Sequence, residues 1–142
     1  MAFRSILVVD DDPAMRHLLS VILTDHGWEA RAVASAAEAL RELEARDLDL
    51  VLTDVRMPGM DGLEATRRIR ASQAARGAPE AEGLRLPIVA VTAHAGKEDH
   101  EECLAAGMDD WLPKPFAFDQ LVGRIERWVP WAFAAGAPEG SA

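Results

Sequence analysis

Short apolar segments that suit β-strands alternate with segments of helical periodicity along most of the chain. Ile6–Val9 is a continuous run of β-branched residues and leucine, as expected of a strand that is covered on both faces. The next segment begins with Asp12, a favoured N-cap residue, and Pro13 at the first helical position. Five such pairs predict a doubly wound α/β fold, in which helices cover both faces of a five-stranded parallel sheet.

The boundaries of the elements follow from the same signals. We expect strands at Ile6–Val9, Trp28–Val33, Leu48–Thr53, Ile88–Val91 and Trp111–Leu112. We expect helices from Asp12 to Gly27, from Ser35 to about Ala45, from Asp61 to about Ala71, at Lys97–Ala106 and at Asp119–Val129. The stretch Ser72–Leu86 is long for a loop and is predicted to be the least ordered internal segment. Residues 1–130 are expected to form one domain, and the Ala/Gly/Pro-rich residues 131–142 a flexible tail.

Composition excludes several classes of protein. The 142 residues suit one domain, and the single cysteine, Cys103, rules out an internal disulfide framework or a cysteine-ligated zinc finger. The formal charge is −9, with no basic run, so neither nucleic acid nor an anionic membrane is an expected partner. No apolar run is long enough to cross a membrane, and we therefore expect a cytoplasmic protein.

Polar residues stand where the predicted strands end. Asp10 and Asp11 follow the first strand, Asp54 the third, Thr92 the fourth and Lys114 the fifth. In parallel sheets the carboxyl ends of the strands meet at one edge, which is where ligands bind. If the first and third strands are neighbours, the three aspartates crowd one crevice and repel one another. Mg²⁺, which prefers carboxylate oxygens, and a lysine would relieve that repulsion.

Four segments together resemble the receiver domain of two-component response regulators: Ile6–Asp12, Leu52–Gly62, Ile88–Ala93 and Leu112–Phe116. The similarity runs from about Phe3 to Val129, and it is greatest to receivers of hybrid histidine kinases. It implies a flavodoxin-like sheet with the strand order 2-1-3-4-5.

The resemblance also implies a role for each residue at the strand ends. Asp54 would accept a phosphoryl group from a sensor histidine kinase or a histidine phosphotransfer protein. Mg²⁺ would be held by Asp10, Asp11, Asp54 and the backbone carbonyl of Arg56. Thr92 and Lys114 would bind phosphoryl oxygens, and the Lys114–Pro115 bond would be cis. Such a domain is a phosphoacceptor rather than an enzyme, with at most its own phosphorylation and dephosphorylation as activity.

Three further residues are expected to modulate the site. Trp111 occupies the position of the family's aromatic switch residue, where it is bulkier than the usual Tyr or Phe. The face formed by the fourth helix, the fifth strand and the fifth helix would change on phosphorylation, and it could pair two copies of the chain. Arg56 and His94 each stand two places after a site residue, and we expect them to shield the phosphoryl group from water and to slow its hydrolysis.

Two other functions fit parts of the sequence. A small haloacid-dehalogenase-like phosphatase also begins with an apolar strand that ends in Asp-x-Asp, and it would use Asp10 as its nucleophile. The chain is short for that fold, and Asp54 would lose its role. A pseudo-receiver, which binds a partner without phosphorylation, is the other alternative; the intact acidic set and Lys114 argue against it. The sequence leaves open whether the receiver stands alone or belongs to a hybrid kinase.

Overall fold

The computed structural model describes residues 4–55, 62–75, 77, 85–93 and 96–129. Five strands form one parallel sheet in the order β2-β1-β3-β4-β5, which confirms the predicted fold class and strand order. The strands are β1 (Ser5–Val9), β2 (Glu29–Val33), β3 (Leu50–Thr53), β4 (Ile88–Thr92) and β5 (Asp110–Pro113). The helices are α1 (Pro13–Asp25), α2 (Ala36–Ala45), α3 (Gly62–Ala75), α4 (Lys97–Ala106) and α5 (Phe118–Trp128).

Two predicted boundaries are wrong by more than one residue, and several others differ by one. α3 continues to Ala75 instead of ending near Ala71, because glutamine and alanine favour a helix, so the first four residues of the predicted loop Ser72–Leu86 are helical. β3 begins at Leu50 rather than Leu48. The predicted tail 131–142 lies outside the described residues, as does Asp61.

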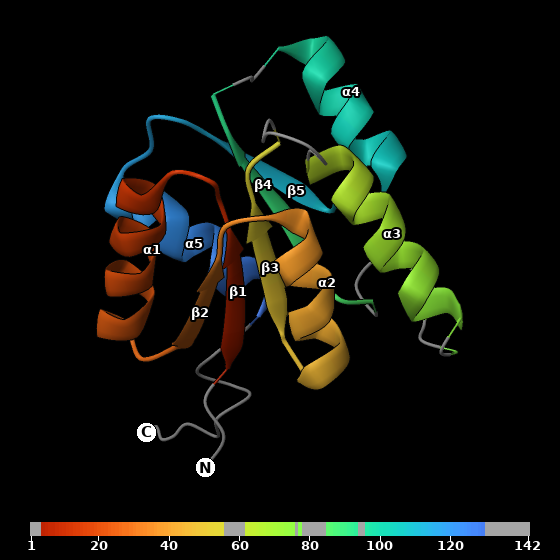
Figure 1. Ribbon diagram of the computed structural model, residues 1–142. Helices are drawn as coiled ribbons and strands as arrows, with labels where there is room; N and C mark the ends of the chain where they lie inside the picture. Colours follow the sequence, from red (N-terminus) through yellow and green to blue (C-terminus); the bar gives the residue numbers. More distant parts are fainter. Residues whose placement is uncertain (1–3, 56–61, 76, 78–84, 94–95, 130–142) are drawn as a thin grey trace.

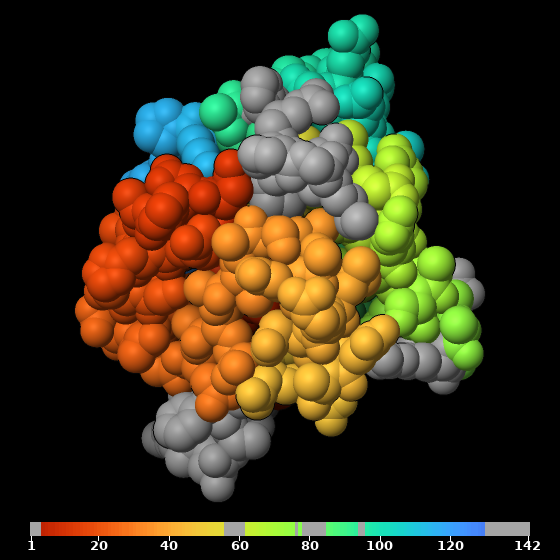
Figure 2. Space-filling view, in the orientation of Figure 1, coloured from red at the N-terminus to blue at the C-terminus, as the bar shows by residue number. Residues whose placement is uncertain are grey.

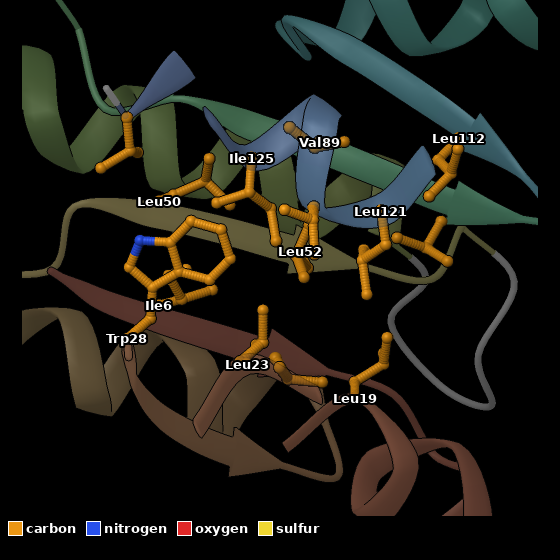
Figure 3. Close-up of a cluster of buried hydrophobic side chains, with 14 residues drawn as sticks. Ile6, Leu19, Leu23, Trp28, Leu50, Leu52, Val89, Leu112, Leu121 and Ile125 are labelled. Carbon is orange, nitrogen blue, oxygen red and sulfur yellow. The ribbon is translucent and has the colours of Figure 1, made fainter. Parts of the chain in front are cut away.

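The helices lie in two layers, one on each face of the sheet (Figure 1). α1 and α5 cover one face, and α2, α3 and α4 cover the other. Under α1 and α5, Trp28 packs with leucine and isoleucine side chains that the strands and both helices supply (Figure 3). Cys103 contributes to the core of the opposite layer, as expected of a small buried residue.

Local signals explain where the first two helices begin and end. Asp12 caps α1 by accepting a hydrogen bond from the Ala14 amide at 3.0 Å, as predicted. Gly27 ends this helix in the left-handed region, with φ of 103°, where a side chain would be strained. Ser35 caps α2 by accepting from the Glu38 amide at 3.2 Å.

Two consecutive aspartates anchor the start of β5, one on each side of the sheet. The buried carboxylate of Asp109 accepts hydrogen bonds from Arg70 of α3 at 2.6 Å and from Arg85 at 2.7 Å. The carboxylate of Asp110 accepts from Arg124 at 2.6 Å and from the Trp128 indole at 2.9 Å, both of α5. Burial lowers the pKa of the Arg70 guanidinium, and the opposing charge of Asp109 acts to raise it.

On the side of the molecule that the space-filling view shows, the surfaces of α1 and α2 are neighbours, and α4 lies at the upper edge (Figure 2). Within the described ranges, no helix combines the length and apolarity that a membrane span needs.

Candidate active site

The pairing of β1 with β3 brings the predicted aspartates together. Val9 and Thr53 are partners in the register, and the Asp54 amide donates to the Val9 carbonyl at 2.9 Å, so Asp10 and Asp54 leave adjacent strands side by side. Asp10, Asp11 and Asp54 each place a carboxylate oxygen within 4.8 Å of the other two. The three aspartates expected to meet at this edge of the sheet therefore do so.

The three carboxylates differ in exposure and in their partners. Asp10 is 2% exposed; its Oδ1 accepts from the Asp12 amide at 2.9 Å, and its Oδ2 lies 3.4 Å from the Lys114 ammonium. Asp11 is exposed, and Asp54 is intermediate, with 15% of its side chain exposed. Asp54 is thus more open than Asp10 to a reactant that approaches the crevice.

Lys114 reaches the crevice from the end of β5. Its amide donates to the Thr92 carbonyl at 2.8 Å, which fixes the backbone beside the end of β4. Its Nζ lies 3.4 Å from Asp10 and 3.7 Å from Asp54, so one cation serves two carboxylates. The Lys114–Pro115 peptide bond is cis, as the resemblance implies.

Gly62, the first residue of α3, lies directly against the backbone of Asp54. Its amide donates to the Val55 carbonyl at 2.8 Å, and a methyl group on its Cα would overlap the Asp54 carbonyl oxygen. Glycine therefore lets α3 start close beside Asp54. Thr92 is fully buried at the end of β4.

The donor set suits Mg²⁺. Three carboxylates within reach of one point offer the hard oxygen ligands that this cation takes, and the partial exposure of the crevice leaves room for water ligands. The Arg56 carbonyl, expected as a further ligand, lies outside the described residues, as do the side chains of Arg56 and His94 that were expected at the rim.

Two contacts near the site were not foreseen. Trp111, expected at the switch position, stacks on His100 of α4, with the ring centroids 4.4 Å apart and an angle of 17° between the planes. Arg16 of α1 donates to the backbone carbonyl of Asp10 at 2.8 Å. Sequence gives a weak signal for the second contact, because an arginine at the fourth helical position can reach back over the preceding turn. It gives none for the first, because rings eleven residues apart meet only through the fold.

Residues 6–126 match the family described as "Response regulator receiver domain". The chain therefore belongs to the receiver-domain family of two-component signal transduction, whose members act as phosphoacceptors.

Several relatives of known sequence are sensor kinases. The chain is 42% identical over 134 residues to "Sensor protein GacS" of Pseudomonas syringae pv. syringae, which covers 94% of this chain and 14% of that protein. It is 42% identical over 116 residues to "Sensor histidine kinase RcsC" of Salmonella typhi, covering 82% of this chain and 11% of that protein. The chain thus spans a small part of these relatives, which agrees with the predicted likeness to hybrid-kinase receivers.

Solved structures also resemble this chain. The receiver domain of sensor histidine kinase PA1611 from Pseudomonas aeruginosa PAO1, described with a magnesium ion coordinated in its active-site cleft, has a TM-score of 0.78 and 38% identity, covering 91% of this chain and 99% of that chain. The chemotaxis protein CheY4 of Vibrio cholerae has a TM-score of 0.79 and 30% identity, covering 89% of this chain and 98% of that chain. Neither the haloacid-dehalogenase alternative nor the pseudo-receiver is favoured by these likenesses.

Proposed function

We propose that Asp54 accepts a phosphoryl group from a phosphohistidine, with Mg²⁺ bound by Asp10, Asp11 and Asp54. The observation that carries this proposal is the position of Lys114 Nζ, 3.4 Å from Asp10 and 3.7 Å from the more open Asp54. Asp10 suits binding rather than attack, because it is buried and its two oxygens already face the Asp12 amide and Lys114. The same contrast makes Asp10 a poor nucleophile for the alternative phosphatase reaction.

The chemistry asks for one bond exchange. An Asp54 carboxylate oxygen attacks the phosphorus, the bond between phosphorus and the histidine nitrogen breaks, and the imidazole leaves with the electron pair. Lys114 supplies positive charge to the transferred group, and the Thr92 hydroxyl, at the end of the neighbouring strand, binds one of its oxygens. When bound, Mg²⁺ neutralises further charge on the phosphoryl oxygens.

A small phosphodonor tests the chemistry without a protein partner. We expect acetyl phosphate with Mg²⁺ to add one phosphoryl group to the wild type and none to Asp54→Asn, as measured by the mass of the intact protein. Asp25→Asn, at the far end of α1, is the matched control and should label normally. Labelling of Asp54→Asn, or undiminished labelling of the wild type in EDTA, would contradict the proposal.

An apolar groove beside Lys114 supports a protein as the physiological donor. The groove, of about 420 Å³, is lined by Met15, Leu18, Ala93, Pro115, Phe116 and Lys114. Leu18 of α1 is 46% exposed, and Val21, one turn further, is 42% exposed. Apolar side chains exposed next to a reaction site suit contact with a protein surface. We propose that a sensor histidine kinase or histidine phosphotransfer protein docks here.

Two donors separate docking from chemistry. We expect Leu18→Ser to slow phosphoryl transfer from a phosphorylated histidine phosphotransfer protein and to leave labelling by acetyl phosphate unchanged. Leu104→Ser on α4 is the matched control, because Leu104 is 49% exposed and lies in a different helix. Equal slowing by both variants, or slowing with both donors, would argue against this docking surface.

The stack of Trp111 on His100 supports an output through the face formed by α4, β5 and α5. We propose that phosphorylation shifts an existing equilibrium of α4, and that the two rings couple β5 to that helix. Hydrogen exchange with and without a beryllofluoride mimic tests this, and changes confined to α1 and α2 would contradict it.

The same face also carries complementary charges that would suit a dimer. Glu98 and Glu101 are exposed on α4, whereas Arg127 of α5 has 68% of its side chain exposed. We expect sedimentation to show beryllofluoride-dependent pairing that Arg127→Glu and high salt weaken.

A further inference from the structure

Arg16 makes a long-reaching contact from α1 to the end of β1. Its backbone amide donates to the Asp12 carbonyl at 3.0 Å, so it is the fourth helical residue after the cap. Side chains in helices lean toward the N-terminus, and this arginine is long enough to return over the turn. Its Nη1 donates to the carbonyl oxygen of Asp10 at 2.8 Å.

Helix stability does not account for a cation at this position. The N-terminal end of a helix carries partial positive charge, which disfavours an arginine near the first turn. The first turn of α1 contains no acidic residue, and the acidic residue beside it is the N-cap Asp12. The guanidinium lies instead against Asp10, in the acidic turn that joins β1 to α1.

Arg16 completes the set of contacts that hold Asp10. The Asp10 amide donates to the Val33 carbonyl at 3.2 Å, Oδ1 accepts from the Asp12 amide, and Oδ2 lies beside Lys114. The carbonyl that Arg16 binds belongs to the peptide group between Asp10 and Asp11. Holding this carbonyl sets the orientation of the peptide plane, and therefore the direction in which the exposed Asp11 carboxylate leaves the backbone.

We propose that Arg16 is a positioning residue for the metal site. By fixing the peptide group between Asp10 and Asp11, Arg16 raises the affinity of this site for Mg²⁺. This inference rests on the proposed function. The direction of the change in Mg²⁺ affinity tests it: an arginine that acted through its charge alone would repel the cation, and its removal would tighten binding. An arginine that holds the ligands in place does the opposite.

Calorimetric titration with Mg²⁺ distinguishes the two effects. We expect Arg16→Met to raise the Kd for Mg²⁺ about tenfold, within the range typical of residues that orient metal ligands. Arg16→Lys, which keeps the charge but has a shorter reach, should give a Kd between those of Arg16→Met and the wild type. The control Arg41→Met removes one positive charge from the exposed side of α2 and should leave the Kd unchanged. If Arg16→Met does not fold, Arg16→Gln takes its place with the same expected rise.

A second readout needs no metal. Because Arg16 holds the turn that contains Asp11 and Asp12, we expect Arg16→Met to speed hydrogen exchange at the Asp12 amide in EDTA, with the amides of β1 unchanged. A Kd that falls or stays constant in Arg16→Met would overturn the inference while leaving the proposed function standing. A wild type that binds no Mg²⁺ would instead overturn the proposed metal site.

Discussion

α4 and α5 flank the same edge strand, yet they are fastened to the molecule in different ways. α5 buries Leu121, Val122 and Ile125, and its Arg124 and Trp128 donate to Asp110 at the start of β5. Of the ten residues of α4, all of them described, two small ones, Cys103 and Ala106, are buried. Neither helix begins with a capping side chain, since the N-cap is Gly96 in α4 and Ala117 in α5.

The buried residues of α4, Cys103 and Ala106, lie toward its C-terminal end. Arg70 donates to the Gly107 carbonyl at 2.9 Å and also holds Asp109, so the turn that follows α4 is fixed to α3. Nearer the N-terminal end, the stack of His100 on Trp111 is a contact without a hydrogen bond. Elements with few buried contacts open and move most readily. We therefore expect α5 to be the more stable of the two helices and α4 to be the one that moves.

Removing a core side chain from each helix should give the largest contrast. We expect Ile125→Ala in α5 to lower the free energy of unfolding by about 3 kcal/mol, because it deletes a large, fully buried side chain. Cys103→Ala in α4 should cost about 1 kcal/mol, because little volume is lost. Urea unfolding measures both, and equal losses would break the comparison.

The anchor of α5 should contribute less than its core. We expect Asp110→Ala to lower the free energy of unfolding by about 2 kcal/mol, because the Trp128 indole loses its acceptor and Arg124 loses its ion pair and keeps the Trp111 carbonyl. Glu101→Ala, on the exposed side of α4, should change stability by less than about 0.5 kcal/mol. Indistinguishable urea midpoints for the two variants would show that α5 is not held through Asp110.

Hydrogen exchange of the unphosphorylated protein should separate the helices without a mutation. We expect amides in the middle of α4 to exchange about tenfold faster, or more, than those in the middle of α5, because local opening of α4 exposes little apolar surface. Matching protection in the two helices would remove the physical basis for assigning movement to α4.

The ring stack should give the smallest effect on stability. We expect His100→Ala to cost about 0.5–1 kcal/mol and to shift the Trp111 indole N–H signal in a proton–nitrogen correlation spectrum. His100→Phe keeps an aromatic ring that can stack on Trp111 and is therefore the matched control. An unshifted Trp111 signal in His100→Ala would mean that the rings do not stack in solution.

What sequence could predict depended on how local each signal was. The apolar runs, the cap at Asp12 and the stop at Gly27 act within a few residues, and the elements they predicted are present. The crevice of Asp10, Asp11 and Asp54 was predictable because a parallel sheet brings its strand ends to one edge. The end of α3 was placed too early, since its last turn follows no apolar periodicity and depends on the helix propensity of Gln73, Ala74 and Ala75.

Contacts between distant polar side chains could not be predicted in this way. Arg70 and Asp109 are 39 residues apart in sequence, and Arg124 and Asp110 are 14 apart. The sequence near either arginine does not indicate which residue accepts its hydrogen bond. Several other arginines of the chain pair with acids close by in sequence, as Arg68 does with Glu64. The partner of Arg70 or of Arg124 is therefore decided by the fold, after the apolar pattern has set the topology.

The two aspartates at the start of β5 also bear on how the strand finds its alignment. β5 is an edge strand of four residues, paired on one side with β4, and so short a strand has few ladder contacts to specify its register. Consecutive residues of a strand face opposite sides of the sheet, so a slip by one position would turn Asp109 away from Arg70 and Asp110 away from Arg124. Each slipped alignment would leave buried charges unpaired, at a cost far above that of one lost backbone hydrogen bond. Asp109 and Asp110 thereby exclude misaligned forms of β5 and keep Lys114 in step with the ends of the other strands.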